Sequence, residues 1–176
     1  MATAVAAPSA ALPAQVDPQL LKAVLDSVSN ALIMCNAPAR CVGVSSVPTR
    51  DQGLITGMIG VHGKVSGFIT VNLSEKFAIR AVEGLLQDSY GELSSQVIDG
   101  AGEITNIIVG GIKSALANTQ WGFSHITVPS VIVGTGYQIA YSRGLEFLCV
   151  TFEHQNEEFL MLSDRLLQVS VSMLRL

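Results

Sequence analysis

Two polar side chains, Glu103 and Asn106, stand three residues apart in a segment that is otherwise mostly apolar or glycine. The segment, DGAGEITNIIVGGIKSA, runs from Asp99 to Ala115, and its apolar residues recur at helical spacing. Residues three apart are neighbours on a helix surface, so the acid and the amide should point outward side by side. Such a pair can contact a partner protein. Nucleophilic hydrolysis by a serine is not supported, because no serine stands in a GxSxG turn.

The same segment contains four glycines, each of which destabilises a helix by roughly 1 kcal/mol relative to alanine. Two explanations are open. The glycines let the helix pack closely on a sheet, and the polar pair is simply solvated. Alternatively, Gly102 and Gly110 remove bulk around the pair so that a partner surface can approach it. Asparagine is a poor helix former and has no obvious capping role at position 106, which favours the second explanation.

A period of 3.6 residues divides this helix into two faces. We expect it to start near Ser89 or Gly91 and to end near Asn118. The apolar face, which should pack on the sheet, carries Leu93, Val97, Ala101, Ile104, Ile108, Ile112 and Ala115. The opposite polar stripe carries Gln96, Asp99, Glu103, Asn106, Gly110 and Lys113.

The other elements must hold this helix in place. Asp17-Pro18 is typical of a helix start, and apolar residues then repeat at helical spacing as far as Met34. Ser74 should cap a further helix that ends near residue 87. Alternating patterns predict strands in RCVGVSSV, GLITGMIGV and VSGFITVNL, which should form a meander with a turn at 62–64. After Trp121, an expected core anchor, they predict strands in HITVPSVIVG, YQIAYS, LEFLCVTFE and EEFLML. The last residues, QVSVSMLRL, could be a strand, a helix or an arm onto a partner.

Helices set apart from runs of strands predict an α+β fold, an antiparallel sheet of about six strands with helices packed on one face, including the long helix. The length of 176 residues suits one core. We expect a disordered N-terminal arm at 1–16 and a single domain at 17–176.

The amino-acid composition limits the classes of function that the chain can have. Apolar residues make up 49% and charged residues 14% of the chain, which suggests that another copy covers part of the surface. The net charge of -4 excludes the basic stripe that nucleic-acid binding needs. The sequence contains no run of 18 apolar residues, so no membrane span is predicted. Three cysteines without a CxxC pair, Cys35, Cys41 and Cys149, are expected to be buried thiols of a reducing compartment, and we expect a cytoplasmic protein.

Two further patterns are weaker. His62, His125 and His154 are expected on different elements, so structural roles are favoured over metal binding. The GTG at 134–136 begins like a phosphate loop, but a strand pattern follows it, which favours a turn.

The spacing of four residues resembles the motif of the CheC, CheX and FliY chemotaxis phosphatases, which dephosphorylate the response regulator CheY. That motif is an acidic residue or serine, three residues, glutamate, two residues, asparagine, twenty-two residues and proline. Asp99, Glu103, Asn106 and Pro129 match every fixed position, with 107–128 as the intervening residues. The resemblance covers roughly 18–162.

CheC carries a second copy of the motif on its first helix. In this sequence only Asn30 matches that copy, because Ala23, Ser27 and Gly53 occupy the other positions. A single site on the second long helix is similar to CheX, and that resemblance implies a homodimer whose sheets join across the interface.

The resemblance also implies a mechanism and a partner, a phosphorylated CheY-like receiver domain. The receiver supplies Mg²⁺ and a lysine around its aspartyl phosphate, so the phosphatase needs no cofactor or metal of its own. Asn106 would position the attacking water, and Glu103 would pair with the receiver's lysine. Asp99, Gly102, Gly110 and Lys113 would line the partner contact. Two alternatives stay open: a CheX-like binding or scaffold module without catalysis, and a stripe buried between subunits.

Overall fold

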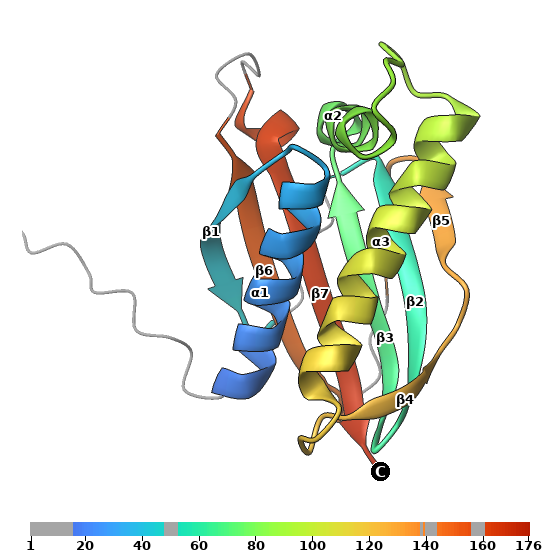
Figure 1. Ribbon diagram of the computed structural model, residues 1–176. Coiled ribbons are helices and arrows are strands. Elements are labelled where there is room, and N and C mark those ends of the chain that lie inside the picture. Colours follow the sequence, from blue (N-terminus) through green and yellow to red (C-terminus); the bar gives the residue numbers. More distant parts are fainter. Residues whose placement is uncertain (1–15, 48–52, 138, 140–143, 156–160) are drawn as a thin grey trace, which may run out of the picture.

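The computed structural model describes residues 16–47, 53–137, 139, 144–155 and 161–176 (Figure 1). The fold is α+β, as expected, with three helices and seven strands in the described part. The helices are α1 (Pro18–Met34), α2 (Glu75–Leu86) and α3 (Ser95–Leu116). The strands are β1 (Ala39–Ser45), β2 (Ile55–Gly63), β3 (Val65–Leu73), β4 (Phe123–Ile126), β5 (Ser130–Val133), β6 (Glu146–His154) and β7 (Leu166–Arg175), and a 3₁₀ turn, η1 (Leu162–Arg165), precedes β7.

The strands form one antiparallel sheet in the order β1-β6-β7-β3-β2, and β4 and β5 both pair with β2 at the far edge. The three helices lie on one face of this sheet (Figure 1). The expected meander is only partly correct: β2 and β3 form a hairpin, but β1 pairs with β6. The C-terminal segment, whose structure the sequence left open, forms strand β7, which pairs with β3.

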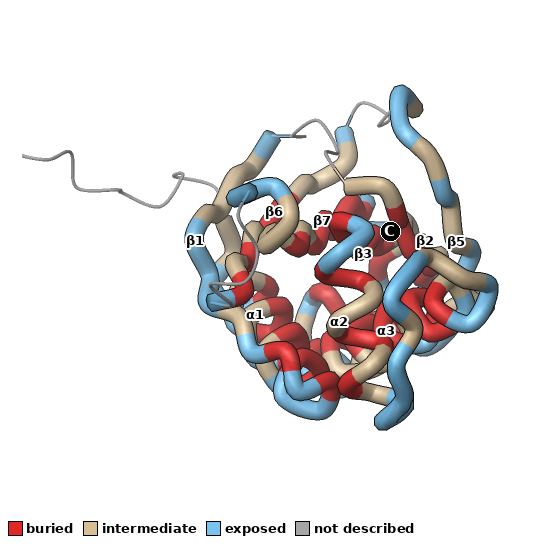
Figure 2. The backbone as a smooth tube through the Cα atoms, turned by 90° about the horizontal axis from the view of Figure 1, so that it is seen from above, coloured by how far each residue is buried: buried red, intermediate tan, exposed pale blue. Residues whose placement is uncertain are grey.

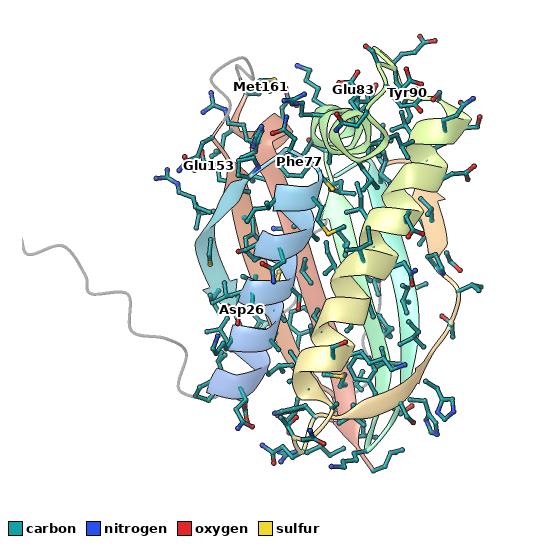
Figure 3. All side chains as sticks on the ribbon, viewed as in Figure 1. Asp26, Phe77, Glu83, Tyr90, Glu153 and Met161 are labelled. Atoms are coloured by element: carbon teal, nitrogen blue, oxygen red, sulfur yellow. The ribbon has the colours of Figure 1, made fainter. Side chains whose placement is uncertain are left out.

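The start of α3 lies later than expected, because a loop anchored by Glu83 precedes it. The Glu83 carboxylate at the end of α2 accepts hydrogen bonds from the backbone N–H groups of Tyr90 (2.9 Å) and Gly91 (3.4 Å). Figure 3 shows Glu83 and Tyr90 close together over α2, beside the first turn of α3. Ser94 then caps the helix by accepting from the N–H of Val97. This loop sets where α3 begins over the sheet.

The core lies between the helices and the sheet (Figure 2). Trp121 is 1% exposed, which confirms its expected place in the core. On α3, Ala115 is exposed and Leu116 is buried instead, which corrects the end of the expected apolar face. No helix in the described part of the chain has the length and apolar character needed to cross a membrane.

The cysteines differ in burial. Cys35 and Cys149 are buried, but Cys41 is exposed on the edge strand β1, so the expectation of three buried thiols is wrong. Burial raises the pKa of the Cys35 thiol to about 11, which keeps it protonated at neutral pH.

Three expected strands differ from the structure or lie partly outside it. HITVPSVIVG is divided into β4 and β5 around 127–129, where Thr127 exchanges hydrogen bonds with Gly60 through its backbone N–H and its side chain. Of YQIAYS, only Tyr137 and Ile139 are described, and neither is in a strand. Of EEFLML, only Met161 and Leu162 are described, and η1 begins at Leu162. The GTG at 134–136 is a turn with positive φ at both glycines. Except for Val16, the expected arm at 1–16 lies outside the described residues.

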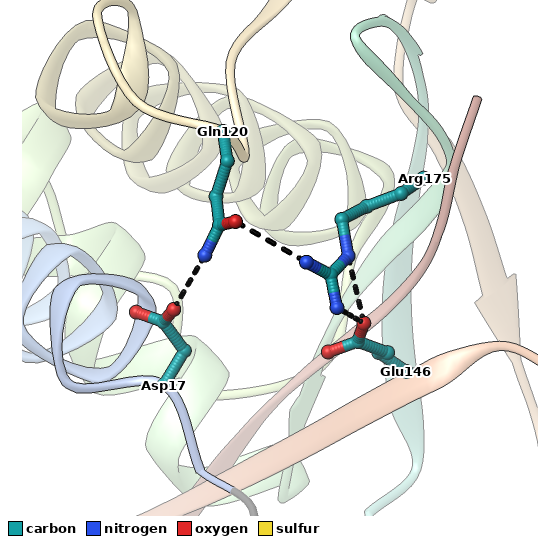
Figure 4. Close-up of polar contacts among 4 residues, drawn as sticks. All are labelled: Asp17, Gln120, Glu146 and Arg175. Carbon is teal, nitrogen blue, oxygen red and sulfur yellow. Dashed lines mark hydrogen bonds and ion pairs between the residues drawn. The ribbon is translucent and has the colours of Figure 1, made fainter.

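A polar cluster at the end of the molecule where α1 begins ties α1, β6 and β7 to the loop after α3 (Figure 4). The Gln120 amide donates to Asp17 (2.9 Å) and accepts from Arg175 (3.2 Å), whose guanidinium also pairs with Glu146. Burial would raise the pKa of Asp17, but surrounding donors, including the N–H groups of Gln19 and Leu20, lower it below its ordinary value. Because Gln120 follows α3 by four residues, the cluster holds the C-terminal end of that helix.

Candidate functional site

The polar stripe of α3 faces outward as its spacing predicts. Asp99 and Glu103 are exposed, and Asn106 is half-buried one turn further along. Among the residues that the structure describes, none forms a hydrogen bond or ion pair with these three side chains. An acid and an amide without partners among the described residues are available to bind another molecule.

Three of the four glycines in α3 serve contacts within the chain. A Cβ atom on Gly100 would lie 2.6 Å from Val82 of α2, and one on Gly111 would lie 2.9 Å from Ser27 of α1. Gly102 is buried, and its Cβ would lie 3.3 Å from Val131 of β5. Gly102 therefore does not line an open partner contact, because β5 already covers it. For these three glycines close packing is the correct explanation.

Gly110 is different, because a Cβ atom added there would meet no described residue within 4 Å. It is half-buried, one helical turn after Asn106 on the same stripe. No described residue packs against this position, so nothing in the described part of the fold offsets the cost of the glycine to the helix, roughly 1 kcal/mol. The explanation that a partner approaches bare backbone is therefore retained only for Gly110.

The distant proline of the motif comes to the same helix. Pro129 immediately precedes β5, and its Cγ atom would lie 3.8 Å from a Cβ on Gly102, the residue before Glu103. Proline lacks a backbone N–H, so it fits at this break between β4 and β5. The spacing of residues 103, 106 and 129 thus reflects a contact between α3 and the edge strand.

The structure also explains why α1 lacks a second site. Ser27 and Ala23 occupy the glutamate and acid positions of the missing copy, and both are buried. Ser27 packs against Gly111 of α3, so a glutamate in its place would put a charge inside the contact between the two helices. Only Asn30 of that set is exposed.

A contact that sequence reasoning missed seats α3 on the sheet directly below the site. Thr105, which is fully buried next to Asn106, donates a hydrogen bond to the Ala101 carbonyl (2.8 Å). A Cβ on Gly57 of β2 would lie only 1.9 Å from the Thr105 hydroxyl. Gly57, inside the strand pattern GLITGMIGV, was the available signal, because glycine within a strand often marks a close approach.

The sheet brings two of the histidines together, since His62 of β2 lies opposite His125 of β4. The third, His154, is buried, and its ring meets Phe77 edge-on at 5.6 Å between centroids. In the described part of the chain, no group of three or more His, Cys, Asp or Glu residues could hold a metal ion.

Solved structures of chemotaxis proteins share this fold. CheX from Vibrio vulnificus is 22% identical, with a TM-score of 0.74 over 88% of this chain and 99% of that one. CheX from Desulfovibrio desulfuricans is 22% identical, with a TM-score of 0.73 over 88% and 99%. Borrelia burgdorferi CheX, solved in complex with CheY, BeF₃ and Mg²⁺, is 20% identical, with a TM-score of 0.69 over 88% and 97%. None of the curated proteins matches this sequence significantly.

The fold of this chain is thus the fold of solved CheX proteins. The family model described as chemotaxis phosphatase CheX matches residues 55–153, more than half of the chain. The chain therefore belongs to the CheX family, whose members act on phosphorylated CheY.

Proposed function

We propose that this chain hydrolyses the aspartyl phosphate of a CheY-like receiver domain, with Asn106 positioning the water. The observation that carries the proposal is the pair Glu103 and Asn106, which stands on one outward stripe without a partner in the described chain and beside the bare backbone of Gly110. Membership of the CheX family supports it. The deciding test is release of inorganic phosphate from a phosphorylated receiver, with and without the chain; a scaffold module would bind the receiver without accelerating release.

The chemistry required of the chain is small. Hydrolysis of an aspartyl phosphate needs a water in line with the phosphorus, and the receiver brings Mg²⁺ and a lysine to neutralise the phosphoryl oxygens. A neutral amide suits the remaining task, because it can accept from and donate to water without repelling those oxygens. Asn106 is one helical turn from Glu103, so a receiver lysine that pairs with the carboxylate would bring the phosphoryl group toward the amide.

The role of Glu103 predicts a binding defect. We expect Glu103→Ala to raise KM for the phosphorylated receiver about tenfold and to lower kcat less, because the carboxylate mainly fixes how the two proteins dock. Steady-state phosphate release over a range of receiver concentrations measures both constants. Glu92→Ala, another exposed carboxylate ahead of α3, is the matched control and should leave both unchanged. An equal loss in both variants would count against a specific role for Glu103.

Gly110 predicts opposite effects on stability and function. We expect Gly110→Ala to stabilise the fold by up to about 1 kcal/mol, since alanine favours the helix and its Cβ would contact none of the described residues. The same methyl group should raise KM, and Gly110→Leu should raise it further, because bulk then separates the receiver from α3. Denaturant unfolding and phosphate release test the two arms. A more stable variant with unchanged KM would show that no partner approaches this position.

The remaining parts of the proposal concern assembly. We infer a homodimer that forms through β1, because this edge of the sheet is open and lies away from α3, whereas the edge formed by β4 and β5 flanks the site. Exposed Val42 and Cys41 lie on that strand. A dimer of this kind leaves the stripe of Asp99 and Glu103 uncovered, unlike one that buries it. We place the protein in the cytoplasm, where its phosphorylated partner would be.

A further inference from the structure

A groove runs beside the C-terminal half of α3, on the same side of the helix as the end of the polar stripe. It lies between the last turns of α3, the turn that joins β2 to β3, and the start of β4, with a volume of about 710 Å³. Ala117, Gly122 and Phe123 supply its apolar lining, and Lys64 and Lys113 supply its charges. The lining therefore suits an apolar group that has an anionic neighbour.

The groove is built into the fold. The backbone N–H of Lys64 donates to the Gly122 carbonyl (2.9 Å), and its ammonium donates to the Thr119 carbonyl (3.0 Å). A Cβ on Gly63 would lie 2.6 Å from the Cα of Phe123, so the turn presses directly on β4. A groove held by backbone contacts binds with little loss of conformational entropy.

The two lysines differ from several other cations of the chain. Lys22, Arg40, Lys76 and Arg175 each pair with a carboxylate. Neither Lys64 nor Lys113 forms an ion pair with any described residue. In a chain of net charge -4, two ammonium groups at one groove, without a carboxylate partner among the described residues, form a local positive site. The stripe is thus acidic at Asp99 and Glu103 and basic at its other end.

The groove lies within reach of a partner centred on Asn106. Lys113 follows Asn106 by seven residues, or about 10 Å along a helix that rises 1.5 Å per residue. A typical interface covers about 800 Å² per partner and is therefore roughly 30 Å wide. A receiver docked with its phosphoryl group at Asn106 would extend over Gly110 to the groove.

We propose that this groove is a second contact for the phosphorylated receiver domain and takes an apolar side chain flanked by a carboxylate. This inference rests on the proposed function and adds to it an orientation: the receiver's lysine lies toward Glu103 and its acidic surface toward Lys113. Opposite charges at the two ends of the stripe disfavour the reversed arrangement, because it would place like charges together.

The test compares Lys113→Glu with Lys22→Glu, which makes the same charge change on the exposed side of α1. Receiver binding is measured with beryllofluoride and Mg²⁺ as the phosphoryl mimic, and phosphate release is measured separately. We expect Lys113→Glu to raise Kd and KM about tenfold with kcat within twofold, and Lys22→Glu to change Kd less than twofold. Ala117→Trp, which fills the groove without a charge change, should also raise Kd.

The outcomes separate the two proposals. Wild-type binding and hydrolysis, with Lys113→Glu and Ala117→Trp both behaving like Lys22→Glu, would overturn the groove contact and leave the proposed function intact. Binding without hydrolysis, weakened by Lys113→Glu, would support the groove and overturn catalysis. A wild-type chain that neither binds nor hydrolyses would overturn both. Thermal unfolding of each variant shows that a raised Kd does not come from loss of structure.

Discussion

Asn106→Ala is expected to lower the rate of catalysed phosphate release at least about 100-fold, while the variant still folds and still binds the receiver. The amide contributes by orienting a water, and loss of one positioning group in a preorganised site lowers the rate by roughly 10²–10³. Asn106 is half-buried on the surface of α3 and has no bond to the described fold, so its removal should leave stability nearly unchanged. Single-turnover phosphate release at saturating chain isolates the chemical step.

Asn30→Ala is the matched control for this prediction. Asn30 is also an exposed helical amide, on α1, but the motif positions before it hold Ala23 and Ser27 in place of an acid and a glutamate. We expect it to leave phosphate release and receiver affinity unchanged. Unchanged single-turnover release by Asn106→Ala would reject the role given to the amide, whatever the effect at Glu103.

The site could be predicted from the sequence because its geometry is local. A helix places residues three and four apart on one stripe, so exposure of Asp99 and Glu103 follows from spacing alone. The caps at Asp17, Ser74 and Ser94 are likewise local, since a side chain at the first position bonds the next turn. The start of α3 was placed too early because the loop before it is fixed by Glu83, a residue of the preceding helix.

The residues that pack against the α3 glycines could not be predicted from the neighbouring sequence. Val82, Ser27 and Val131 come from three different elements, and only the tertiary fold brings each to its glycine. Sequence spacing therefore treated Gly102 and Gly110 alike, although one is covered by β5 and the other is open. The strand order has the same origin: β7 pairs with β3 across almost a hundred residues of chain, a contact that no periodicity encodes.

Gly57→Ala is the substitution that should most affect fold and site together. The new methyl carbon would lie 1.9 Å from the Thr105 hydroxyl and within 3 Å of two Thr105 carbons. Thr105 cannot easily rotate away, because its hydroxyl is bonded to the Ala101 carbonyl inside the helix. We expect a loss of about 2–3 kcal/mol in the free energy of unfolding, typical of a severe overpacking change. Gly43→Ala, where the nearest atom is 3.7 Å away, should lose far less.

The same overpacking should also lower the rate of phosphate release, because Thr105 and Asn106 are adjacent on α3. Relief of the contact pushes the helix off β2, and a displacement near 1 Å at a positioning group can lower the rate by about 10²-fold. Thr105→Ala in the Gly57→Ala background removes two of the three close atoms and leaves one at 2.8 Å, so it should restore part of both stability and phosphate release. This coupling, measured as a double-mutant cycle, would be absent if Gly57→Ala acted only by making the strand less flexible.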